Sequence, residues 1–219
     1  MNWLLTFFKR IIYLSMIESL LTLVLLSAQT VFSPNGHYQG IIEYASVIDL
    51  TTLSFTLTDT AGDTLYTKLN PEPITYYVTD DATVFATNET KLYFYLRNGR
   101  DTLLKNLNYP NGFGFSPDYS LFFASDRDEL TAYCTGGKLR LRLKPARLFA
   151  STAQGMTVAT VSGDTLIIYH EGKEKYAVKL ATPFIHELAF SPDGQSILLK
   201  EPSGKEIFDA NSGKKREEK

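Results

Sequence analysis

The stretch AFSPDGQSILL, at residues 189–199, contains a five-residue segment that recurs along the chain. Residues 190–194 read FSPDG, residues 115–119 read FSPDY and residues 32–36 read FSPNG. Proline restricts one backbone dihedral, and Asp or Asn accepts backbone N–H bonds, so each copy predicts a tight turn between two strands. A reaction needs its acid once or twice, whereas a repeated fold needs its turn every time. We therefore interpret Asp118 and Asp193 as turn caps and not as catalytic acids.

The sequence after each turn follows one pattern of apolar strand, polar turn, second strand, Gly-containing hairpin and third strand. Five such units begin at Phe32, Val78, Phe115, Phe149 and Phe190. A short strand precedes four of the turns, at residues 74–78, 111–115, 146–150 and 185–190. Four antiparallel strands every 35 to 45 residues or so are typical of propeller blades. The sequence therefore predicts an all-β fold, a small β-propeller of about five four-stranded blades.

Both ends of the repeat array depart from this pattern. No clear strand precedes Phe32, and the tail KKREEK at residues 214–219 is too short and polar for an ordinary fourth strand. We expect a closed or nearly closed ring over residues 31–213. An open arc would leave two exposed sheet edges, which would require a partner or a second copy.

Gly residues mark the hairpin between the last two strands of successive units, where tight turns need a positive φ. These pairs are Asn98-Gly99, Gly136-Gly137, Glu171-Gly172 and Ser212-Gly213. The strand KLRLRLK, at residues 138–144, alternates Leu with Lys or Arg. Such alternation favours a charged outer edge strand over a nucleic-acid-binding stripe.

The FSPDG turn, followed by strands, a hairpin and a Ser-Gly-Lys ending, resembles the repeats of bacterial β-propellers of the WD-like and Tol-associated type. The resemblance covers residues 31–213, with the full motif at 190–194 and single departures at 115–119 and 32–36. It implies that the first strand of each blade lines a central channel. It implies little about function, because propellers carry unrelated activities.

Composition excludes several classes of protein. The chain has 219 residues, with 22 Lys and Arg against 24 Asp and Glu, and therefore a net charge of −2. It lacks the basic excess of a nucleic-acid-binding protein. Its single cysteine, Cys134, excludes an internal disulfide and a cysteine zinc site, and its apolar surroundings predict a buried position.

Within residues 1–28, an apolar run from Ile11 to Ala28 follows Lys9 and Arg10 and ends in Leu26-Ser27-Ala28. The positive residues before the run predict a cytoplasmic N-terminus and an exported remainder, either periplasmic or extracellular. The run is short and contains Glu18, so we favour a hydrophobic helix that acts as a cleaved signal peptide. The alternatives are an outward-facing membrane anchor, which would be the only membrane contact, and an amphipathic helix of a cytoplasmic protein.

Candidate ligand contacts come from predicted first strands and the turns beside them. Glu187, with His186 next to it, is the acid in a predicted first strand, and Asp80 and Asp81 lie in a turn at one rim. The sequence DRDE at 126–129 could hold calcium, but it lacks the Gly and ligand spacing of a calcium loop, so we expect an exposed polar turn. No catalytic constellation, metal site or cofactor site is predicted.

We therefore expect a non-catalytic, exported β-propeller that presents rim loops to a protein partner and does not bind nucleic acid. The alternative is a carbohydrate-active enzyme or lectin on a five-bladed ring, which as a glycosidase would need two carboxylates converging at the channel. A third hypothesis is a membrane-tethered fragment of a larger propeller assembly.

Overall fold

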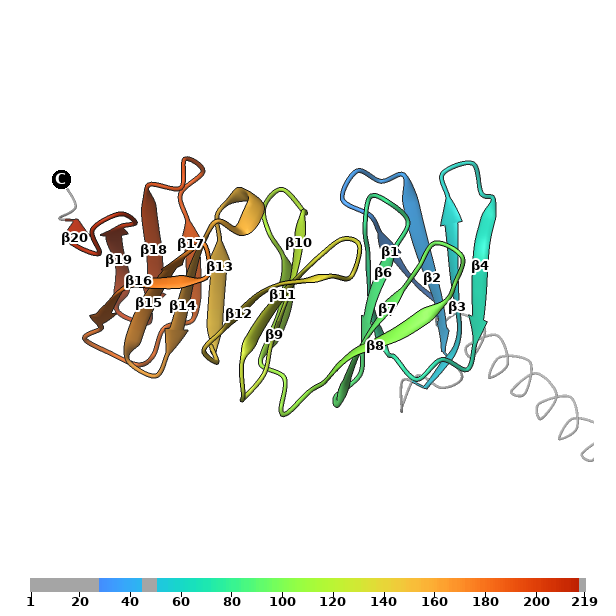
Figure 1. Ribbon diagram of the computed structural model, residues 1–219, viewed down its shortest axis with the longest axis horizontal. Helices are drawn as coiled ribbons and strands as arrows, with labels where there is room; N and C mark the ends of the chain where they lie inside the picture. Colours follow the sequence, from blue (N-terminus) through green and yellow to red (C-terminus); the bar gives the residue numbers. More distant parts are fainter. Residues whose placement is uncertain (1–27, 45–50, 217–219) are drawn as a thin grey trace, which may run out of the picture. The chain divides into compact units, whose positions relative to one another are not determined.

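The computed structural model describes residues 28–44 and 51–216, which form five four-stranded antiparallel sheets (Figure 1). Each sheet is built from four consecutive strands in chain order. The first two sheets contain β1 (Ala28–Phe32), β2 (Tyr38–Tyr44), β3 (Thr52–Asp59) and β4 (Thr64–Leu69), then β5 (Thr75–Val78), β6 (Val84–Thr87), β7 (Lys91–Tyr95) and β8 (Asp101–Asn106). The all-β fold with five four-stranded antiparallel sheets, as in a five-bladed propeller, is confirmed.

The other three sheets follow the same order. They contain β9 (Gly112–Phe115), β10 (Leu121–Ser125), β11 (Leu130–Cys134) and β12 (Leu139–Leu143), then β13 (Leu148–Ser151), β14 (Thr157–Ser162), β15 (Thr165–His170) and β16 (Lys173–Lys179), and finally β17 (Glu187–Phe190), β18 (Ser196–Glu201), β19 (Gly204–Asp209) and β20 (Lys215–Arg216). A 3-10 turn, η1 (Ala153–Gly155), joins β13 to β14.

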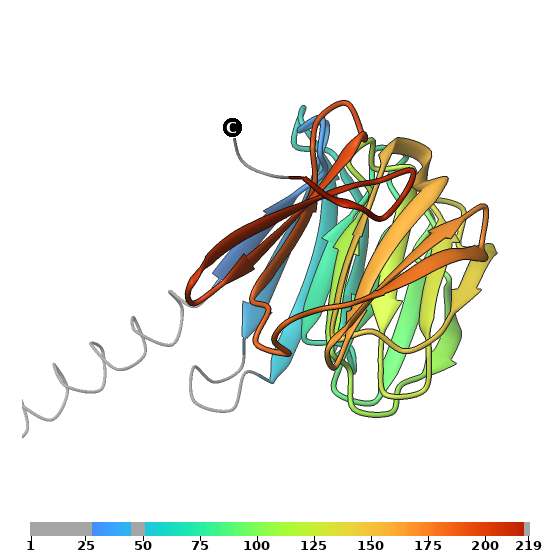
Figure 2. The ribbon, with the colours of Figure 1, turned by 90° about the vertical axis from the view of Figure 1, so that its left-hand side faces the viewer.

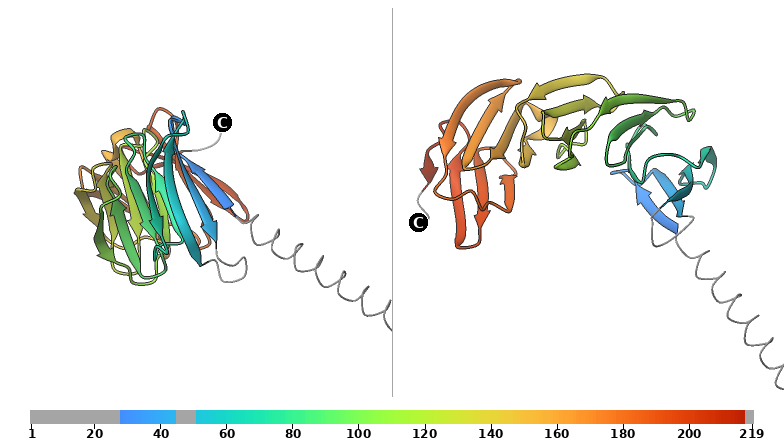
Figure 3. Two further views of the ribbon diagram at one scale, coloured as in Figure 1. Left: turned by 90° about the vertical axis from the view of Figure 1, so that its right-hand side faces the viewer. Right: turned by 90° about the horizontal axis from the view of Figure 1, so that it is seen from below.

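The chain divides into two compact units. Of the described residues, unit 1 contains 28–44, 51–88 and 95–102, and unit 2 contains 89–94 and 103–216. In unit 2 the last three sheets lie face against face, one after another along the chain (Figures 2 and 3). Each of these sheets twists along its strands, as antiparallel sheets do.

The core of unit 2 lies between successive sheets. Neighbouring residues of β15 point to opposite faces, so Leu166 and Ile168 pack toward the sheet β17–β20, whereas Ile167 and Tyr169 pack toward the sheet β9–β12. Because both faces of this sheet are covered, the sequence TLIIYH of β15 is apolar and buried at its four central positions. Burial on two sides thus explains a strand without the alternation typical of a half-exposed sheet.

The predicted strand positions agree with the structure, with three corrections. A strand does precede Phe32, because β1 begins at Ala28 and pairs with β2. The polar tail does contribute a strand, because Lys215 and Arg216 pair with β19 as β20. The turn hydroxyl of the fourth unit is that of Thr152, two residues after position 150, where a unit that starts at Phe149 would have placed it.

Strands therefore extend past residues 31–213 at both ends. The predicted N-terminal helix, at residues 1–27, and the last three residues lie outside the described residues. Within residues 28–44 and 51–216, no helix is both long and apolar enough to span a membrane.

The hairpin glycines have positive φ as predicted, for example 78° at Gly99 and 76° at Gly137. Each also packs against a side chain of the preceding sheet. A Cβ atom on Gly137 would lie 2.6 Å from the Phe94 ring, and one on Gly213 would lie 2.5 Å from the Tyr176 ring. The hairpin glycines therefore serve the packing of one sheet on the next, in addition to the turn itself.

Two further predictions concern single residues. The strand at 138–144 is confirmed as an outer strand, since β12 pairs with β11 alone at the edge of its sheet. Cys134 is half-buried, not fully buried, because it is the last residue of β11 beside the exposed hairpin.

Candidate binding site on the first strands of unit 2

The turn after the first strand has the same hydroxyl geometry in all five sheets. A Ser or Thr hydroxyl accepts a hydrogen bond from the backbone N–H of the first residue of the second strand, or of the residue just before it, at 2.9 to 3.1 Å. These residues are Ser33, Thr79, Ser116, Thr152 and Ser191. The hydroxyl therefore persists even where the Pro-Asp part of the motif is absent, and it defines the repeat better than Pro-Asp does.

In the turns that contain Asp or Asn, the hydroxyl also donates to that side chain. Ser191 donates to Asp193 at 2.5 Å, and Asp193 accepts the Gln195 N–H at 3.0 Å. Ser116 donates to Asp118 at 2.7 Å in the same way. The Ser191 hydroxyl and the backbone N–H hold the pKa of Asp193 below its ordinary value. The interpretation of both aspartates as turn caps is confirmed.

These turns border a cavity of about 690 Å³ on the first strands of unit 2. β13 and β17 are in contact, and Phe149 of β13 lies beside the backbone of β9. Three half-buried rings contribute to the lining, namely those of Phe115, Phe149 and Phe190. The cavity is therefore formed by corresponding positions of successive sheets.

The Phe149 ring, one of the three, lies beside the two glycines of β9. A Cβ atom on Gly112 would lie 3.6 Å from the Phe149 ring, and one on Gly114 would lie 4.0 Å from it. The ring thus lies against bare backbone and also packs on Phe123, with centroids 5.6 Å apart.

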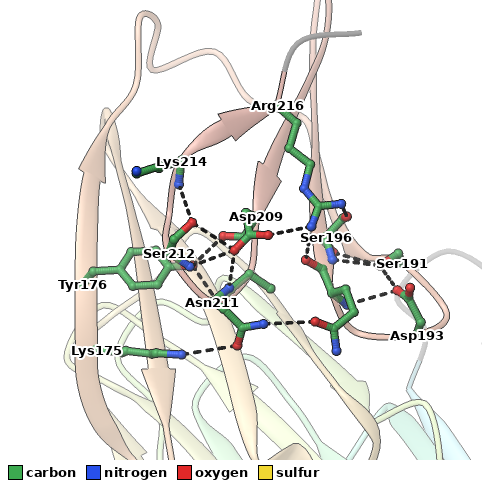
Figure 4. A network of polar contacts seen from close by, with 12 residues as sticks. Lys175, Tyr176, Ser191, Asp193, Ser196, Asp209, Asn211, Ser212, Lys214 and Arg216 are labelled. Carbon is green, nitrogen blue, oxygen red and sulfur yellow. Dashed lines mark hydrogen bonds and ion pairs between the residues drawn. The ribbon is translucent and has the colours of Figure 1, made fainter. Parts of the chain in front are cut away.

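A network of polar contacts positions the rim of the cavity next to β17 (Figure 4). The Asn211 side-chain amide donates to Gln195 Oε1 at 3.0 Å, and its backbone N–H donates to Asp209 Oδ1 at 3.0 Å. Arg216 donates to Asp209 Oδ2 at 2.5 Å and to Ser196 Oγ at 2.7 Å. The Arg216 guanidinium holds the pKa of Asp209 well below its ordinary value.

The hairpin that carries Asn211 is fixed from the neighbouring sheet as well. Tyr176 of β16 donates its hydroxyl hydrogen to the carbonyls of Asp209 and Ala210, at 3.1 and 2.8 Å. Burial raises the pKa of Tyr176 to about 12, so the hydroxyl remains a donor at neutral pH. Gln195 and Asn211 are therefore held in place before any ligand binds.

The lining determines what this cavity can do. It combines three aromatic rings with the polar side chains of Gln195, Asn211 and Asp193. Asp193 is the carboxylate in the lining, and its lowered pKa keeps it ionised at neutral pH. Aromatic rings next to fixed polar groups are a combination that binding sites use. A glycosidase needs a second carboxyl across the substrate, and the residues that line this cavity do not supply one.

The sequence-predicted contacts His186 and Glu187 lie at the other end of β17, away from the cavity lining. Glu187 Oε2 accepts a hydrogen bond from Lys200 Nζ at 2.6 Å, and the His186 N–H donates to the Lys200 carbonyl at 3.0 Å. Both residues thus help to pair β17 with β18. The first strand therefore contributes its apolar end, not its acid, to the cavity.

Asp80 and Asp81 lie in the β5–β6 turn of unit 1. Asp80 accepts the Asn35 N–H at 2.9 Å, and Asp81 accepts the hydroxyls of Thr79 and Thr83. These contacts join two turns of unit 1 and cap one of them. The structure does not bring Asp80 and Asp81 together with His186 and Glu187 in one unit.

The predicted exposed turn at 126–129 is only partly exposed. Arg127 and Asp128 are exposed, but Asp126 is fully buried at 0% exposure. Asp126 Oδ2 pairs with Lys105 Nζ of β8 at 2.8 Å, and Asp126 Oδ1 accepts the backbone N–H groups of Asp128 and Glu129. The carboxylate is thus occupied by structural partners, and no group of three potential metal ligands occurs among the described residues.

Sequence reasoning missed Thr152, Gln195, Asn211 and Tyr176. A signal existed for Asn211, because DANSG in a hairpin is typical of side-chain-capped turns. The fourth-unit turn, TAQGM, shares only its hydroxyl with the other copies, so a search for FSPDG does not find Thr152. Tyr176 acts across a sheet interface, which no local pattern reports.

Comparisons with known proteins agree with the fold. No protein-family model and no curated protein sequence matches the chain. The chain is similar in structure to one described as the crystal structure of the eukaryotic initiation factor, with a TM-score of 0.67 and 13% sequence identity. The match covers 86% of this chain and 53% of the other, so the chain spans about half the length of that structure. At this identity the likeness shows the fold, which is β-propeller-like, and not the function.

Proposed function

We propose that the protein is a non-catalytic binding scaffold of the WD-like and Tol-associated propeller type, exported from the cytoplasm, whose first-strand cavity takes a segment of a protein partner. The observation that carries this proposal is the cavity of about 690 Å³, with its aromatic walls and prearranged Gln195 and Asn211. Side-chain amides of this kind suit the alternating donors and acceptors of a peptide backbone, and rings suit its apolar side chains.

The turn chemistry supports the propeller type. The hydroxyl-to-backbone bond recurs in all five sheets, and the Asp or Asn cap recurs in four of them. A rigid frame of this kind leaves the loops between strands free to vary, which is how repeat scaffolds acquire different partners.

A lectin on the same fold is the second candidate. It is favoured by the same combination of ring faces and amide or carboxylate groups at Gln195, Asn211 and Asp193, which can bind hydroxyl groups. Hydrolysis is not part of this candidate, because Asp193 is a turn cap with a lowered pKa.

Peptide selection on the full chain in mild detergent tests the proposal. Peptides displayed on phage would be selected on the wild-type protein, and their dissociation constants would be measured by calorimetry. The variant Ala189→Trp places a large ring in the cavity lining, so we expect it to weaken selected peptides about tenfold or more. The control variant Lys173→Trp adds the same ring at an exposed position of β16 and should leave the affinity unchanged.

The result contradicts the proposal if no peptide is enriched, or if both Trp variants bind selected peptides as tightly as wild type. A glycan array probed with the same three proteins addresses the second candidate. Binding of glycans by wild type and Lys173→Trp, but not by Ala189→Trp, would support the lectin over the peptide-binding scaffold.

Export has its own test. The chain would be expressed with residues 1–28 in a bacterial host, and the intact mass of the exported protein would be measured. Loss of residues 1–28 supports a signal peptide, whereas their retention in a membrane fraction supports the anchor. Cleavage after Ala28 would leave four of the five residues of β1 in place.

A further inference from the structure

The opposite end of the same first strands carries a second cavity, of about 260 Å³. It lies where the chain enters β9 and β13, whereas the cavity described above lies where the chain leaves them. Its lining includes Tyr109, Asn111, Arg127, Pro145 and Arg147. Neither the turn motif nor the proposed function accounts for this collection of residues.

Tyr109 is unusual in both exposure and backbone conformation. It is 70% exposed, and its φ of 52° lies in the left-handed region that non-glycine residues rarely adopt. Hydrogen bonds on either side maintain this conformation, from the Arg127 N–H to the Asn108 carbonyl and from the Asn111 N–H to the Ser125 carbonyl, both at 2.8 Å. A large ring held exposed at a strained position is a feature of recognition sites.

Two guanidinium groups border the cavity without a carboxylate partner among the described residues. Arg127 lies over the Tyr109 ring, 4.6 Å from its centroid, and Arg147 donates to the Pro183 carbonyl at 3.1 Å. Other arginines of unit 2 do have such partners, for example Arg142 with Glu129 at 2.8 Å. A guanidinium has five N–H donors, so these contacts leave most of its donors available for an anion.

Asp128, the acid nearest in sequence, bonds to a neutral amide and forms no ion pair with Arg127 or Arg147 among the described residues. The Asn108 side-chain amide donates to both oxygens of Asp128, at 3.0 and 3.2 Å. The negative charges of Asp128 and of Glu89, which lines the adjoining cavity, would repel a continuous anionic surface that approached this end of the unit. A single carboxylate that enters the small cavity meets the two guanidinium groups instead.

The adjoining cavity, of about 560 Å³, shares Tyr109 and Asn111 with the 260 Å³ cavity, and its other lining residues are Leu107, Pro110, Glu89, Thr90 and Asn108. Apolar surface from Leu107, Tyr109 and Pro110 beside an arginine-lined cavity fits a polypeptide that carries an acidic residue next to an apolar or aromatic residue. We propose that Arg127 and Arg147 bind a carboxylate of such an acidic segment in a partner protein, while Tyr109 and Leu107 contact the neighbouring apolar side chain. This site is additional to the first-strand cavity.

The probe for this site is the labelled peptide acetyl-Gly-Glu-Phe-Glu-Phe-Gly-amide, and the control peptide has Gln in place of Glu. Fluorescence anisotropy would measure the binding of each to the full chain in mild detergent. We expect the Glu peptide to bind more tightly than the Gln peptide, with an advantage that falls as salt is added. Equal binding of the two peptides would overturn the proposal.

Matched variants locate the binding. The double variant Arg127→Ala/Arg147→Ala should weaken the Glu peptide about tenfold or more, whereas Lys138→Ala/Arg140→Ala removes the same charge near β12 and should have little effect. Arg127→Lys/Arg147→Lys retains the charge but loses the planar fork, so we expect intermediate binding. Circular dichroism would establish that each variant is folded, and the Lys pair maintains the test if the Ala pair does not fold.

Equal weakening by the two Ala double variants would overturn the proposal in favour of general charge attraction. Vesicles of phosphatidylglycerol that bind through Arg127 and Arg147, when the Glu peptide does not, would overturn it in favour of a membrane surface. Ala189→Trp should leave the Glu peptide unaffected. Failure at this site can therefore be told apart from failure of the first-strand cavity.

Discussion

The β10–β11 turn and the β17–β18 turn both hold an aspartate that accepts backbone N–H bonds, yet the two differ in how they depend on the rest of the fold. Asp126 in the first is fully buried and pairs with Lys105 of the preceding sheet. The connection from β17 to β18 is itself formed locally, since Asp193 is bonded to Ser191 and Gln195 within three residues. The first turn therefore depends on a neighbouring sheet, whereas the second is self-contained.

This difference separates residues that determine local structure from residues that join sheets. A self-contained turn can recur wherever a strand must reverse, and its residues make no demand on distant parts of the chain. A turn that depends on its neighbour is constrained by a partner far away in sequence. We expect substitutions in the turn that depends on a neighbouring sheet to cost much more stability than substitutions in the self-contained turn.

The largest effect is expected for Asp126→Asn. The substitution removes one partner of a buried ion pair and leaves the Lys105 ammonium, whose side chain is 13% exposed, with Glu129 alone. We expect a loss of about 3 kcal/mol in the free energy of unfolding. Urea denaturation monitored by far-UV circular dichroism would measure this loss. A loss as small as that of Asp193→Ala would contradict the view that the Asp126 turn depends more on its neighbouring sheet than the Asp193 turn does.

The hairpin glycines give the next largest effect. Gly137→Ala places a Cβ atom 2.6 Å from the Phe94 ring, so we expect a loss of about 2 to 3 kcal/mol from overpacking together with backbone strain. Gly163 also has positive φ, but a Cβ atom there would have no neighbour within 4 Å. Gly163→Ala is therefore the matched control and should cost about 1 kcal/mol. Equal losses would mean that the turn alone requires these glycines.

Acid should destabilise the protein through the same buried turn. Desolvation raises the pKa of Asp126, but Lys105 and the backbone N–H groups lower it by more, so the folded pKa lies below the ordinary 3.8. The resulting stabilisation is complete above the ordinary pKa of 3.8, and it is lost as the pH falls through the lower pKa of the folded state. We expect the urea midpoint to fall between pH 5 and 2 or so more steeply in wild type than in Asp126→Asn. Parallel curves would contradict this assignment.

The smallest effect is expected for Asp193→Ala, because the turn retains the Ser191 hydroxyl bond to the Ser196 N–H at 2.9 Å. We expect a small decrease in the urea midpoint, and Asp118→Ala should behave in the same way. Ser191→Ala, which removes the bond common to all five sheets, should cost more than Asp193→Ala. The reverse order would show that the Asp cap, and not the hydroxyl, maintains the turn.

The strands were predictable because their signals are local. The FSPDG copies located three turns, and hairpin glycines located four more, so β5, β9, β13 and β17 were anticipated within two residues at each end. The turn of the fourth unit was predicted at the wrong residues, because only the hydroxyl, at Thr152, remains of the motif there. The strands β1 and β20 were missed because short, polar segments become strands only when an adjacent strand supplies their hydrogen bonds.

The candidate sites were much less predictable. The acids singled out from the sequence, Glu187 and Asp80 among them, make local strand and turn contacts, while the cavity is lined by rings that the sequence presents as ordinary core. The sequence predicts Arg127 as part of an exposed polar turn. No pattern in the adjacent sequence indicates that it lines one cavity together with Arg147, some 20 residues away.

The sequence by itself determined the repeat, the turns and the all-β character of this protein, because these depend on dihedral preferences and hydrogen bonds within a few residues. Only the tertiary structure decided which residues are buried between sheets and which line cavities. Lys105 finds Asp126, Tyr176 supports the Asn211 hairpin and Phe149 lies on Gly112 because successive sheets pack face to face. Such contacts join residues some 20 to 40 positions apart, and no local preference encodes them.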